Sequence, residues 1–160
     1  MDKVDILGVK VDPVTIDQAV EKIKGWLEGK EGTKYYIVTP NPEFIMAARV
    51  DPDFMDILNK ADLAIPDGAG LKLSGKVKDM VTGIDLMEKL CEVVASRGFT
   101  MGLLGGRDGV AEKCAECLKK KYPGLKIAFA EDGPEVDKEG EVSSIQYLVF
   151  RDGEKPDTRY

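Results

Sequence analysis

The stretch that decides the fold begins with Tyr35-Tyr36-Ile37-Val38-Thr39-Pro40-Asn41-Pro42-Glu43 and ends with Ala61-Asp62-Leu63-Ala64-Ile65-Pro66-Asp67-Gly68-Ala69-Gly70. Each segment is a short apolar run that ends in polar, turn-forming residues. Open parallel sheets bind ligands just beyond the carboxyl ends of their strands. If both runs are parallel strands, Thr39, Asn41 and Asp67 meet at one edge of the sheet. We expect that edge to be the functional site.

On both sides of this stretch, helical periodicity alternates with short apolar runs. Thr15 and Gln18 fit a capping box at the start of a helix, and Asn41-Pro42 and Asp51-Pro52 are further start signals. The predicted helices cover residues 15–28, 42–48, 52–61, 82–98 and 110–122. The predicted strands cover 4–11 (a strand or hairpin), 34–39, 63–65, 99–104, 126–130 and 146–150. Residues 71–81 are expected to be a short helix and a loop, and 131–144 a polar loop.

Strands that alternate with helices are typical of βαβ units. We therefore predict an α/β fold: a Rossmann-like, mostly parallel sheet with helices on both faces. A chain of 160 residues is long enough to bury the core of one domain. The predicted single domain covers residues 1–150, and residues 151–160 are expected to be a disordered tail.

Composition and charge exclude several classes of protein. The net charge of −6 argues against non-specific nucleic-acid binding, which needs a basic face. No apolar run approaches the length of a membrane span, and the N-terminus lacks the features of a signal peptide, so we expect a cytoplasmic protein. The three cysteines cannot form a closed disulfide framework, and the chain has no histidine. We therefore expect no metal site, and a carboxylate as any general acid or base.

The Pro66-Asp67-Gly68 sequence has two interpretations. It is an excellent turn, in which the Asp bonds local backbone and the Gly supplies a positive φ. Placed after a buried strand, the same carboxylate could take the proton from an attacking hydroxyl group. Thr39 and Asn41 carry donors and acceptors suited to a sugar, although Asn41 also serves as a helix cap. Asp85, in the first turn of a predicted helix, favours the helix dipole and is also a candidate site residue.

A second candidate site follows the strand predicted at 99–104. The turn Gly105-Gly106-Arg107-Asp108-Gly109 leads into a helix, where backbone N–H groups can bind a diphosphate and Arg107 can pair with it. Glu131 and Asp132 follow the next strand, where a Rossmann-type fold places the acid that binds ribose. The dinucleotide fingerprint G-x-G-x-x-G is absent, and a plain structural turn remains the alternative.

Taken together, these motifs resemble the WecG/TagA/CpsF family of bacterial glycosyltransferases. The resemblance covers roughly residues 1–135, with the motifs in the family's order. They are Val4-Asp-Ile-Leu-Gly-Val9, Thr39-Pro-Asn-Pro-Glu43, Ala61-Asp-Leu-Ala-Ile-Pro-Asp-Gly-Ala-Gly70, Thr82-Gly-Ile-Asp-Leu-Met87, Leu103-Leu-Gly-Gly-Arg-Asp-Gly-Val-Ala-Glu112 and Lys121-Tyr-Pro-Gly-Leu-Lys-Ile127.

The resemblance implies a Rossmann-like fold and transfer of an N-acetylmannosamine-type sugar from a UDP-sugar. The implied acceptor is a polyprenyl-diphosphate-linked sugar at the inner membrane face, in the synthesis of teichoic acid, common antigen or capsule. Inverting displacement without a required metal is implied. By motif match, Asp67 would be the catalytic base, Thr39, Asn41, Gly68 and Asp85 would line the substrate pocket, and the segment 105–108 with Glu131 would face the UDP moiety.

Three features depart from the family pattern. Met80 stands where the family usually has an Arg, and the link from Gly70 to Thr82 is shorter than usual. After Phe150 the family's Gly-x-Pro-x-Gln-Glu motif and its membrane-docking C-terminal segment do not follow. We therefore expect a truncated homologue that lacks part of the family's peripheral membrane contact, with uncovered apolar surface that favours a homo-oligomer.

Two other functions remain open from the sequence. The first is a non-catalytic remnant of the same family, able to bind a nucleotide-sugar but not to transfer the sugar. The second is an NAD-dependent oxidoreductase, suggested by the βαβ pattern and by Glu131 alone. Binding of UDP with no turnover would favour the first, and failure to bind NAD would exclude the second.

Overall fold

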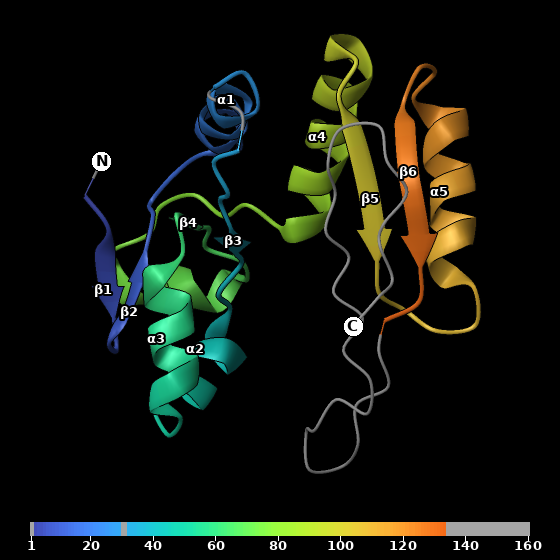
Figure 1. The fold of residues 1–160 in the computed structure, drawn as a ribbon. Helices are drawn as coiled ribbons and strands as arrows, with labels where there is room; N and C mark the ends of the chain where they lie inside the picture. The colour runs from blue at the N-terminus through green and yellow to red at the C-terminus, as the bar shows by residue number, and fades with distance from the viewer. Residues whose placement is uncertain (1, 30–31, 134–160) are drawn as a thin grey trace. The chain divides into compact units, whose positions relative to one another are not determined.

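The computed structural model describes residues 2–29 and 32–133 (Figure 1). The chain forms two compact units, Met1–Leu90 and Cys91–Tyr160. Helices alternate with parallel strand pairs in both units, which confirms the predicted α/β class. Outside the described residues lie the predicted strand 146–150, the predicted tail 151–160 and the part of the predicted loop 131–144 that follows residue 133.

The first unit opens with an antiparallel hairpin of β1 (Val4–Ile6) and β2 (Val9–Val11), in which Val4 pairs with Val11. Its two turn residues, Leu7 and Gly8, have φ values of 53° and 96°. Two successive residues with positive φ match the right-handed twist of a two-residue hairpin. The structure thus selects the hairpin from the two predicted alternatives.

Helix α1 (Ile16–Leu27) begins with the predicted capping box. The Gln18 backbone N–H donates to Thr15 Oγ1 at 3.3 Å, and the Thr15 N–H donates to Gln18 Oε1 at 3.0 Å. Two N–H groups that the first helical turn leaves without a backbone partner are thereby satisfied.

Residues 35–70 contain a parallel pair of strands, β3 (Ile37–Val38) and β4 (Leu63–Ala64). The prediction of a strand over 34–39 was too long. At Tyr36 the carbonyl still accepts from the Asp62 backbone N–H at 3.1 Å, but the Tyr36 N–H donates to the Asp62 side chain at 2.9 Å instead of to a strand carbonyl. The tyrosines at 35 and 36 are exposed, so their high strand propensity did not extend the sheet.

Helices α2 (Pro42–Ala48) and α3 (Pro52–Lys60) connect these two strands. Each begins as predicted, with a side-chain cap followed by a proline. Asn41 Oδ1 accepts from the Phe44 N–H at 2.8 Å, and Asp51 Oδ1 accepts from the Phe54 N–H at 2.9 Å. After β4, the chain forms one 3-10 helix, η1 (Ala69–Ser74), where a short helix and a loop were predicted.

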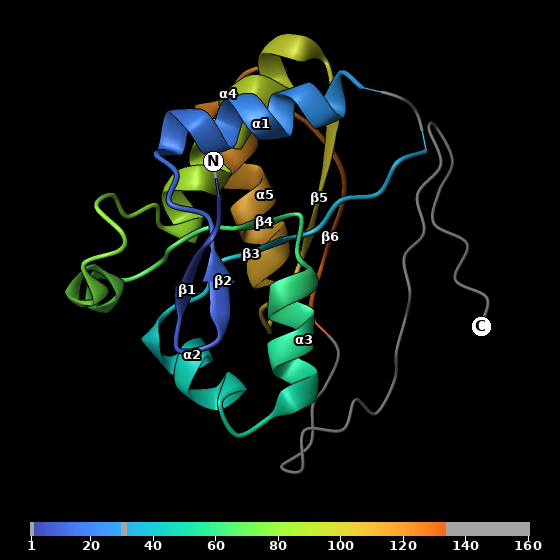
Figure 2. The ribbon, with the colours of Figure 1, turned by 90° about the vertical axis from the view of Figure 1, so that its left-hand side faces the viewer.

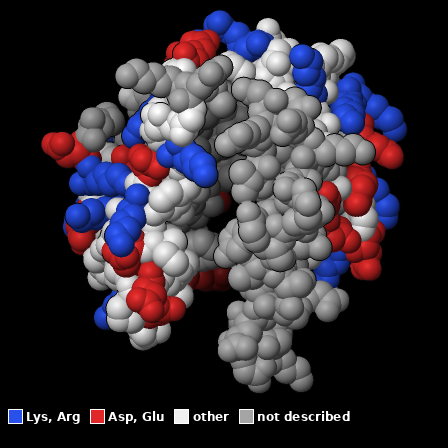
Figure 3. Space-filling view, viewed as in Figure 1, with Lys and Arg blue, Asp and Glu red and all other residues white. Residues whose placement is uncertain are grey.

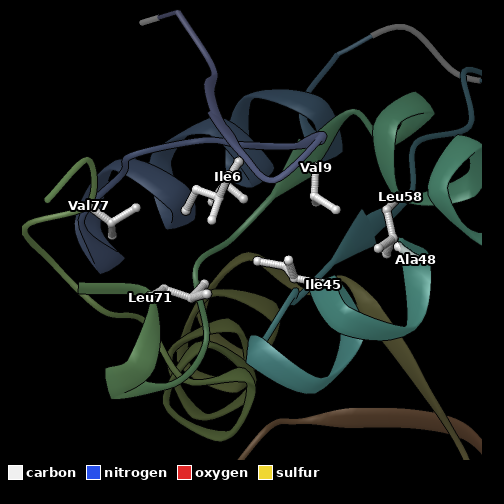
Figure 4. Close-up of a cluster of buried hydrophobic side chains, with 8 residues drawn as sticks. Ile6, Val9, Ile45, Ala48, Leu58, Leu71 and Val77 are labelled. Carbon is white, nitrogen blue, oxygen red and sulfur yellow. The ribbon is translucent and has the colours of Figure 1, made fainter. Parts of the chain in front are cut away.

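Helices cover the β3–β4 pair from opposite sides. In both ribbon views α1 lies above the pair, and α2 and α3 lie below it (Figures 1 and 2). One buried cluster joins α1 to β4 and the start of the next helix through Ala19, Ile23, Leu63, Ile65 and Leu86. The other joins the hairpin to α2, α3 and η1 (Figure 4), and its members are Ile6, Val9, Val11, Ile45, Ala48, Leu58, Leu71 and Val77.

A buried carboxylate ties the hairpin to β4. Asp12 is 5% exposed, and its Oδ2 accepts from the Ala64 N–H at 2.7 Å. The Asp12 N–H donates in turn to the Ala64 carbonyl at 2.7 Å. Lys3 Nζ lies 3.5 Å from the same carboxylate oxygen. A charge paired and hydrogen-bonded in this way can be buried without an unsatisfied group.

The second unit is built on the parallel pair β5 (Thr100–Leu104) and β6 (Lys126–Glu131), joined by α5 (Val110–Lys121). Helix α4 (Gly83–Arg97) begins in the first unit and ends in the second. Its Cys91 and Val94 pack with Leu118 of α5 in the core of this unit. The strands agree with the predicted runs to within one residue at each end.

The described strands therefore form three two-stranded sheets, two of them parallel. Parallel strands need a crossover, and helices supply it both between β3 and β4 and between β5 and β6. Both crossovers lead the chain back to the same edge, so that the segments following the two strands of a pair are neighbours. This property creates the two polar clusters described next.

Candidate active site

The first polar cluster lies where β3 and β4 end. The Asp67 N–H donates to the Pro40 carbonyl at 3.0 Å, which extends the parallel pairing past Val38 and Ala64. The Asp67 carboxylate is half-buried, and its Oδ2 accepts from the Gly83 N–H at 3.2 Å. Segments that are far apart in the sequence therefore hold Asp67 from two sides.

Thr39 lies beside this carboxylate. A Cβ atom built on Gly83 would lie 3.7 Å from Thr39 Cγ2, 3.9 Å from Thr39 Oγ1 and 3.8 Å from Asp67 Oδ2. Gly83 thus borders both side chains and leaves between them the space that a side chain would occupy. The predicted meeting of Thr39 and Asp67 at one edge is confirmed.

Asn41 and Gly68 border the same edge. Gly68 has a φ of 97°, and a Cβ atom on it would lie 3.8 Å from the Asn41 Cβ and 3.2 Å from the Pro42 Cδ. The Asn41 side chain caps α2, as the structural interpretation predicted. Its amide nitrogen is the group that could serve a ligand, so the predicted sugar contact stays a prediction.

Asp85 is exposed in the first turn of α4. Thr82 Oγ1 donates to its carboxylate at 2.7 Å and accepts from its backbone N–H at 3.1 Å. This reciprocal pair caps the helix that supplies the Gly83 N–H to Asp67. Asp85 therefore positions the start of α4, and its role as a substrate ligand stays a prediction.

The chemistry open to this cluster is that of a general base. Among residues 2–29 and 32–133, the Asp67 side chain makes its only hydrogen bond through Oδ2, so Oδ1 is the atom that can accept a proton from a hydroxyl group. Thr39 Oγ1 can donate to or accept from the same ligand. The pair could therefore bind a ligand's hydroxyl group and take its proton.

The second polar cluster lies in the second unit, where β5 and β6 end. The Gly105 N–H donates to the Glu131 carbonyl at 3.0 Å, and the Gly133 N–H donates to the Gly106 carbonyl at 3.2 Å. Gly105, Gly106 and Asp108 all have positive φ. The Gly-rich turn and the segment that follows β6 are therefore neighbours, as the sequence predicted.

The amide at the start of α5 is already bonded. The Gly109 N–H donates to Asp132 Oδ2 at 3.2 Å, so a carboxylate occupies the position where a phosphate was predicted. Glu131 contributes its backbone to the turn, and its side chain is half-buried. Arg107 is exposed in the turn. The predicted nucleotide roles of these residues stay predictions.

Sequence reasoning missed two hydrogen bonds that hold the first unit together. Gly83 donates to the candidate base, and Asp12 joins β2 to β4. The sequence carried a signal for Asp12, since an acid followed by a proline after a strand is a turn signal. The Gly83 contact spans 16 residues and has no local signature.

The described residues contain neither a metal-binding cluster nor a membrane-spanning helix. Within 2–29 and 32–133, no three Cys, Asp or Glu side chains gather in a way that could hold a metal ion. In the same ranges, no helix is both long enough and apolar enough to cross a membrane.

The fold and the first polar cluster define a class: α/β proteins with a polar site beyond the carboxyl ends of parallel strands. The profile of the Glycosyl transferase WecG/TagA/CpsF family matches residues 4–148. The chain therefore belongs to the WecG/TagA/CpsF family, and the resemblance seen in its motifs is confirmed.

Curated relatives agree with this assignment. The chain is 32% identical, over 154 residues, to a protein of Staphylococcus aureus strain NCTC 8325 / PS 47 and to one of strain COL. It is 33% identical to the corresponding protein of strain MRSA252. All three are named N-acetylglucosaminyldiphosphoundecaprenol N-acetyl-beta-D-mannosaminyltransferase. The matches cover 93% of this chain, and the chain spans about 60% of the length of these relatives.

Proposed function

We propose that this chain carries the acceptor-activating site of a glycosyltransferase. The donor is a UDP-activated N-acetylmannosamine-type sugar, and the acceptor is a polyprenyl-diphosphate-linked N-acetylglucosamine. Membership of the family and the names of the relatives support this assignment. The product would feed the synthesis of a cell-surface polysaccharide, at the cytoplasmic face of the membrane.

The observation that carries the proposal is the position of Asp67. Its carboxylate is held by the Gly83 N–H at the end of a buried strand, with the Thr39 hydroxyl beside it. A base fixed in this way can meet an acceptor hydroxyl without first having to be ordered. No histidine occurs in the chain, so a carboxylate is the natural base.

In the proposed reaction, Asp67 takes the proton of the acceptor hydroxyl as its oxygen attacks the anomeric carbon of the donor sugar. The new C–O bond forms as the bond from that carbon to the UDP oxygen breaks, and UDP leaves with the electron pair. Attack from the face opposite UDP inverts the anomeric configuration. The mechanism assigns no step to a metal ion.

The Gly-rich turn of the second unit is the proposed site for the UDP diphosphate. Backbone N–H groups of the turn and the guanidinium of Arg107 would balance the charge that develops on the leaving group. Asp132 bonds the Gly109 N–H in the described structure. We therefore infer that Asp132 releases this N–H group when a diphosphate binds there.

A transfer assay of the Asp67→Asn variant tests the proposal. Asparagine keeps a side-chain oxygen for the Gly83 N–H but cannot act as the base. We expect transfer of labelled sugar from UDP-N-acetylmannosamine to the lipid acceptor to fall by about 10²–10⁴-fold, the range typical of a lost general base. The matched control is Asp53→Asn, which removes an exposed acid from the first turn of α3. Equal activity of Asp67→Asn and wild type would exclude Asp67 as the base.

A further inference from the structure

The charges of the second unit are separated along its strands. Residues 117–130 contain four lysines and no acid, and residues 93–106 contain one arginine and no acid. Most of the acids of this unit between residues 91 and 133 lie where β5 and β6 end or just beyond. They are Asp108, Glu112, Glu131 and Asp132. A whole chain with a net charge of −6 therefore has one end of a unit that carries only cations.

The backbone brings these cations together where β5 and β6 begin. Thr100 pairs with Lys126 at the start of the two strands. Arg97 ends α4 shortly before β5, and the last turn of α5 consists of lysines. We call this surface the basic end of the second unit, and its cations are Arg97, Lys119, Lys120, Lys121 and Lys126.

A tight turn holds α5, β6 and α4 close to one another at the basic end. The Leu125 N–H donates to the Tyr122 carbonyl at 3.1 Å, so the chain passes from the last turn of α5 into β6 within a few residues. A Cβ atom on Gly124 would lie 3.8 Å from the Ala95 carbonyl oxygen, so the turn packs against the end of α4. The five cations therefore share one surface.

The cations of the basic end are exposed. Among residues 2–29 and 32–133, the side chains of Lys119, Lys120 and Lys126 have no ion-pair or hydrogen-bond partner. Figure 3, in the orientation of Figure 1, shows basic side chains gathered at the upper right over the end of α5, with most acidic side chains of the same unit below them. These lysines are available to a partner.

Helix ends account for only part of this charge. The helices α4 and α5 both end at this surface, and a helix C-terminus carries about half a negative charge. Two such ends offset about one of the five positive charges. An excess of about four charges remains, which physiological salt screens only beyond about 8 Å. The basic end therefore attracts an anionic surface that comes into direct contact with it.

The contact would depend on charge alone. In the described segments 97–100 and 117–126, Phe99 and Tyr122 are half-buried against the core, and Leu118 and Leu125 are buried. No large apolar side chain of these segments is exposed for insertion into a partner. Binding through separate exposed lysines needs no fixed ligand geometry, and salt is expected to reverse it.

We propose that the basic end binds the anionic headgroups of a phospholipid bilayer. A bilayer presents many anionic groups in one plane, which is the arrangement that a surface of separate cations fits. The choice of a bilayer among anionic partners rests on the proposed function, because a polyprenyl-linked acceptor lies in a membrane. The Gly-rich turn lies at the opposite end of β5 and β6, so this contact leaves the proposed UDP site open to water.

Sedimentation of the 160-residue chain with lipid vesicles tests the proposal. One set of vesicles contains phosphatidylcholine alone, and the other contains equal parts of phosphatidylcholine and phosphatidylglycerol. We expect binding to the anionic vesicles only. Raising the ionic strength from about 0.05 M to about 0.5 M is expected to weaken that binding at least about tenfold.

A double variant locates the contact, and a matched double variant controls for net charge. Each lysine near an anionic surface contributes roughly fivefold to affinity, so Lys119→Gln with Lys120→Gln is expected to weaken vesicle binding about twentyfold. Glutamine and lysine have similar helix propensities, so α5 is expected to persist. Lys10→Gln with Lys113→Gln removes the same charge from exposed positions outside the basic end, and it is expected to change binding by less than about twofold.

Several results would overturn the proposal. One is a wild-type chain that does not sediment with anionic vesicles. Another is equal vesicle binding by the two double variants. Lysine-dependent binding to polyglutamate or to a duplex oligonucleotide, without vesicle binding, would assign the basic end to an acidic protein or to a nucleic acid instead.

A transfer assay with a short-chain, water-soluble acceptor separates this proposal from the proposed function. Transfer by wild type without any vesicle binding would remove the membrane contact and leave the proposed function in place. Lysine-dependent vesicle binding by a chain that transfers no sugar would support the contact and argue against the proposed function.

Discussion

Gly83 controls the space between Thr39 and Asp67. The Cβ of an alanine at this position would make contacts of 3.7–3.9 Å, which are ordinary van der Waals distances, so Gly83→Ala is expected to fold. The added methyl group would fill the space between the two side chains. We expect a free energy of unfolding within about 1 kcal/mol of wild type, together with a clear loss of transfer activity. Denaturant unfolding and the transfer assay measure the two effects, and unchanged activity would place the substrate elsewhere.

Asp12 is expected to stabilise the first unit more than any exposed acid does. Asp12→Ala leaves the Ala64 N–H buried without its side-chain acceptor. We expect the free energy of unfolding to fall by about 1–3 kcal/mol, the usual cost of an unsatisfied buried donor. Urea unfolding followed by circular dichroism measures it. Asp17→Ala, in the exposed first turn of α1, is the control, and equal losses in both variants would contradict this role for Asp12.

In the second unit, Gly102 of β5 lies directly against the Phe129 ring of β6. A Cβ atom on Gly102 would lie 1.8 Å from Phe129 Cε1, so Gly102→Ala forces the phenyl ring to move. We expect a loss of about 1–3 kcal/mol in the free energy of unfolding. The double variant Gly102→Ala, Phe129→Leu should lose less than the sum of the two single variants. Strict additivity would show that the alanine is accommodated without displacing Phe129.

Among the helices and strands, the features that the sequence predicted well are those set by residues close together in the chain. The helix starts at Thr15, Asn41 and Asp51 could be predicted, because each of these side chains accepts a hydrogen bond from the backbone N–H three residues further along the chain. The strand 34–39 was predicted too long because pairing with β4 is a long-range property, and the Asp62 side chain takes the Tyr36 N–H just before β3 begins. The Gly83 contact to Asp67 is long-range as well.

Some features of the two polar clusters could be predicted from the sequence, and others depend on contacts between distant segments. The meeting of Thr39 with Asp67, and of the Gly105 turn with Glu131, followed from the rule that parallel strands end at one edge. The groove lined by Ile6, Ile45 and Leu71 could not be predicted, because its walls come from the hairpin, α2 and η1. The occupation of the Gly109 N–H by Asp132 depends on side-chain geometry that no motif specifies.

The most direct test of a UDP-sugar site in this chain is a calorimetric titration with UDP, with NAD as the comparison ligand. We predict saturable binding of UDP, none of NAD, and at least about tenfold weaker UDP binding in Arg107→Ala, because a charge-assisted contact to phosphate is lost. Lys113→Ala, which removes a cation from α5 outside the turn, is the control. Binding of NAD in place of UDP, or of neither nucleotide, would contradict a UDP-sugar site in this chain.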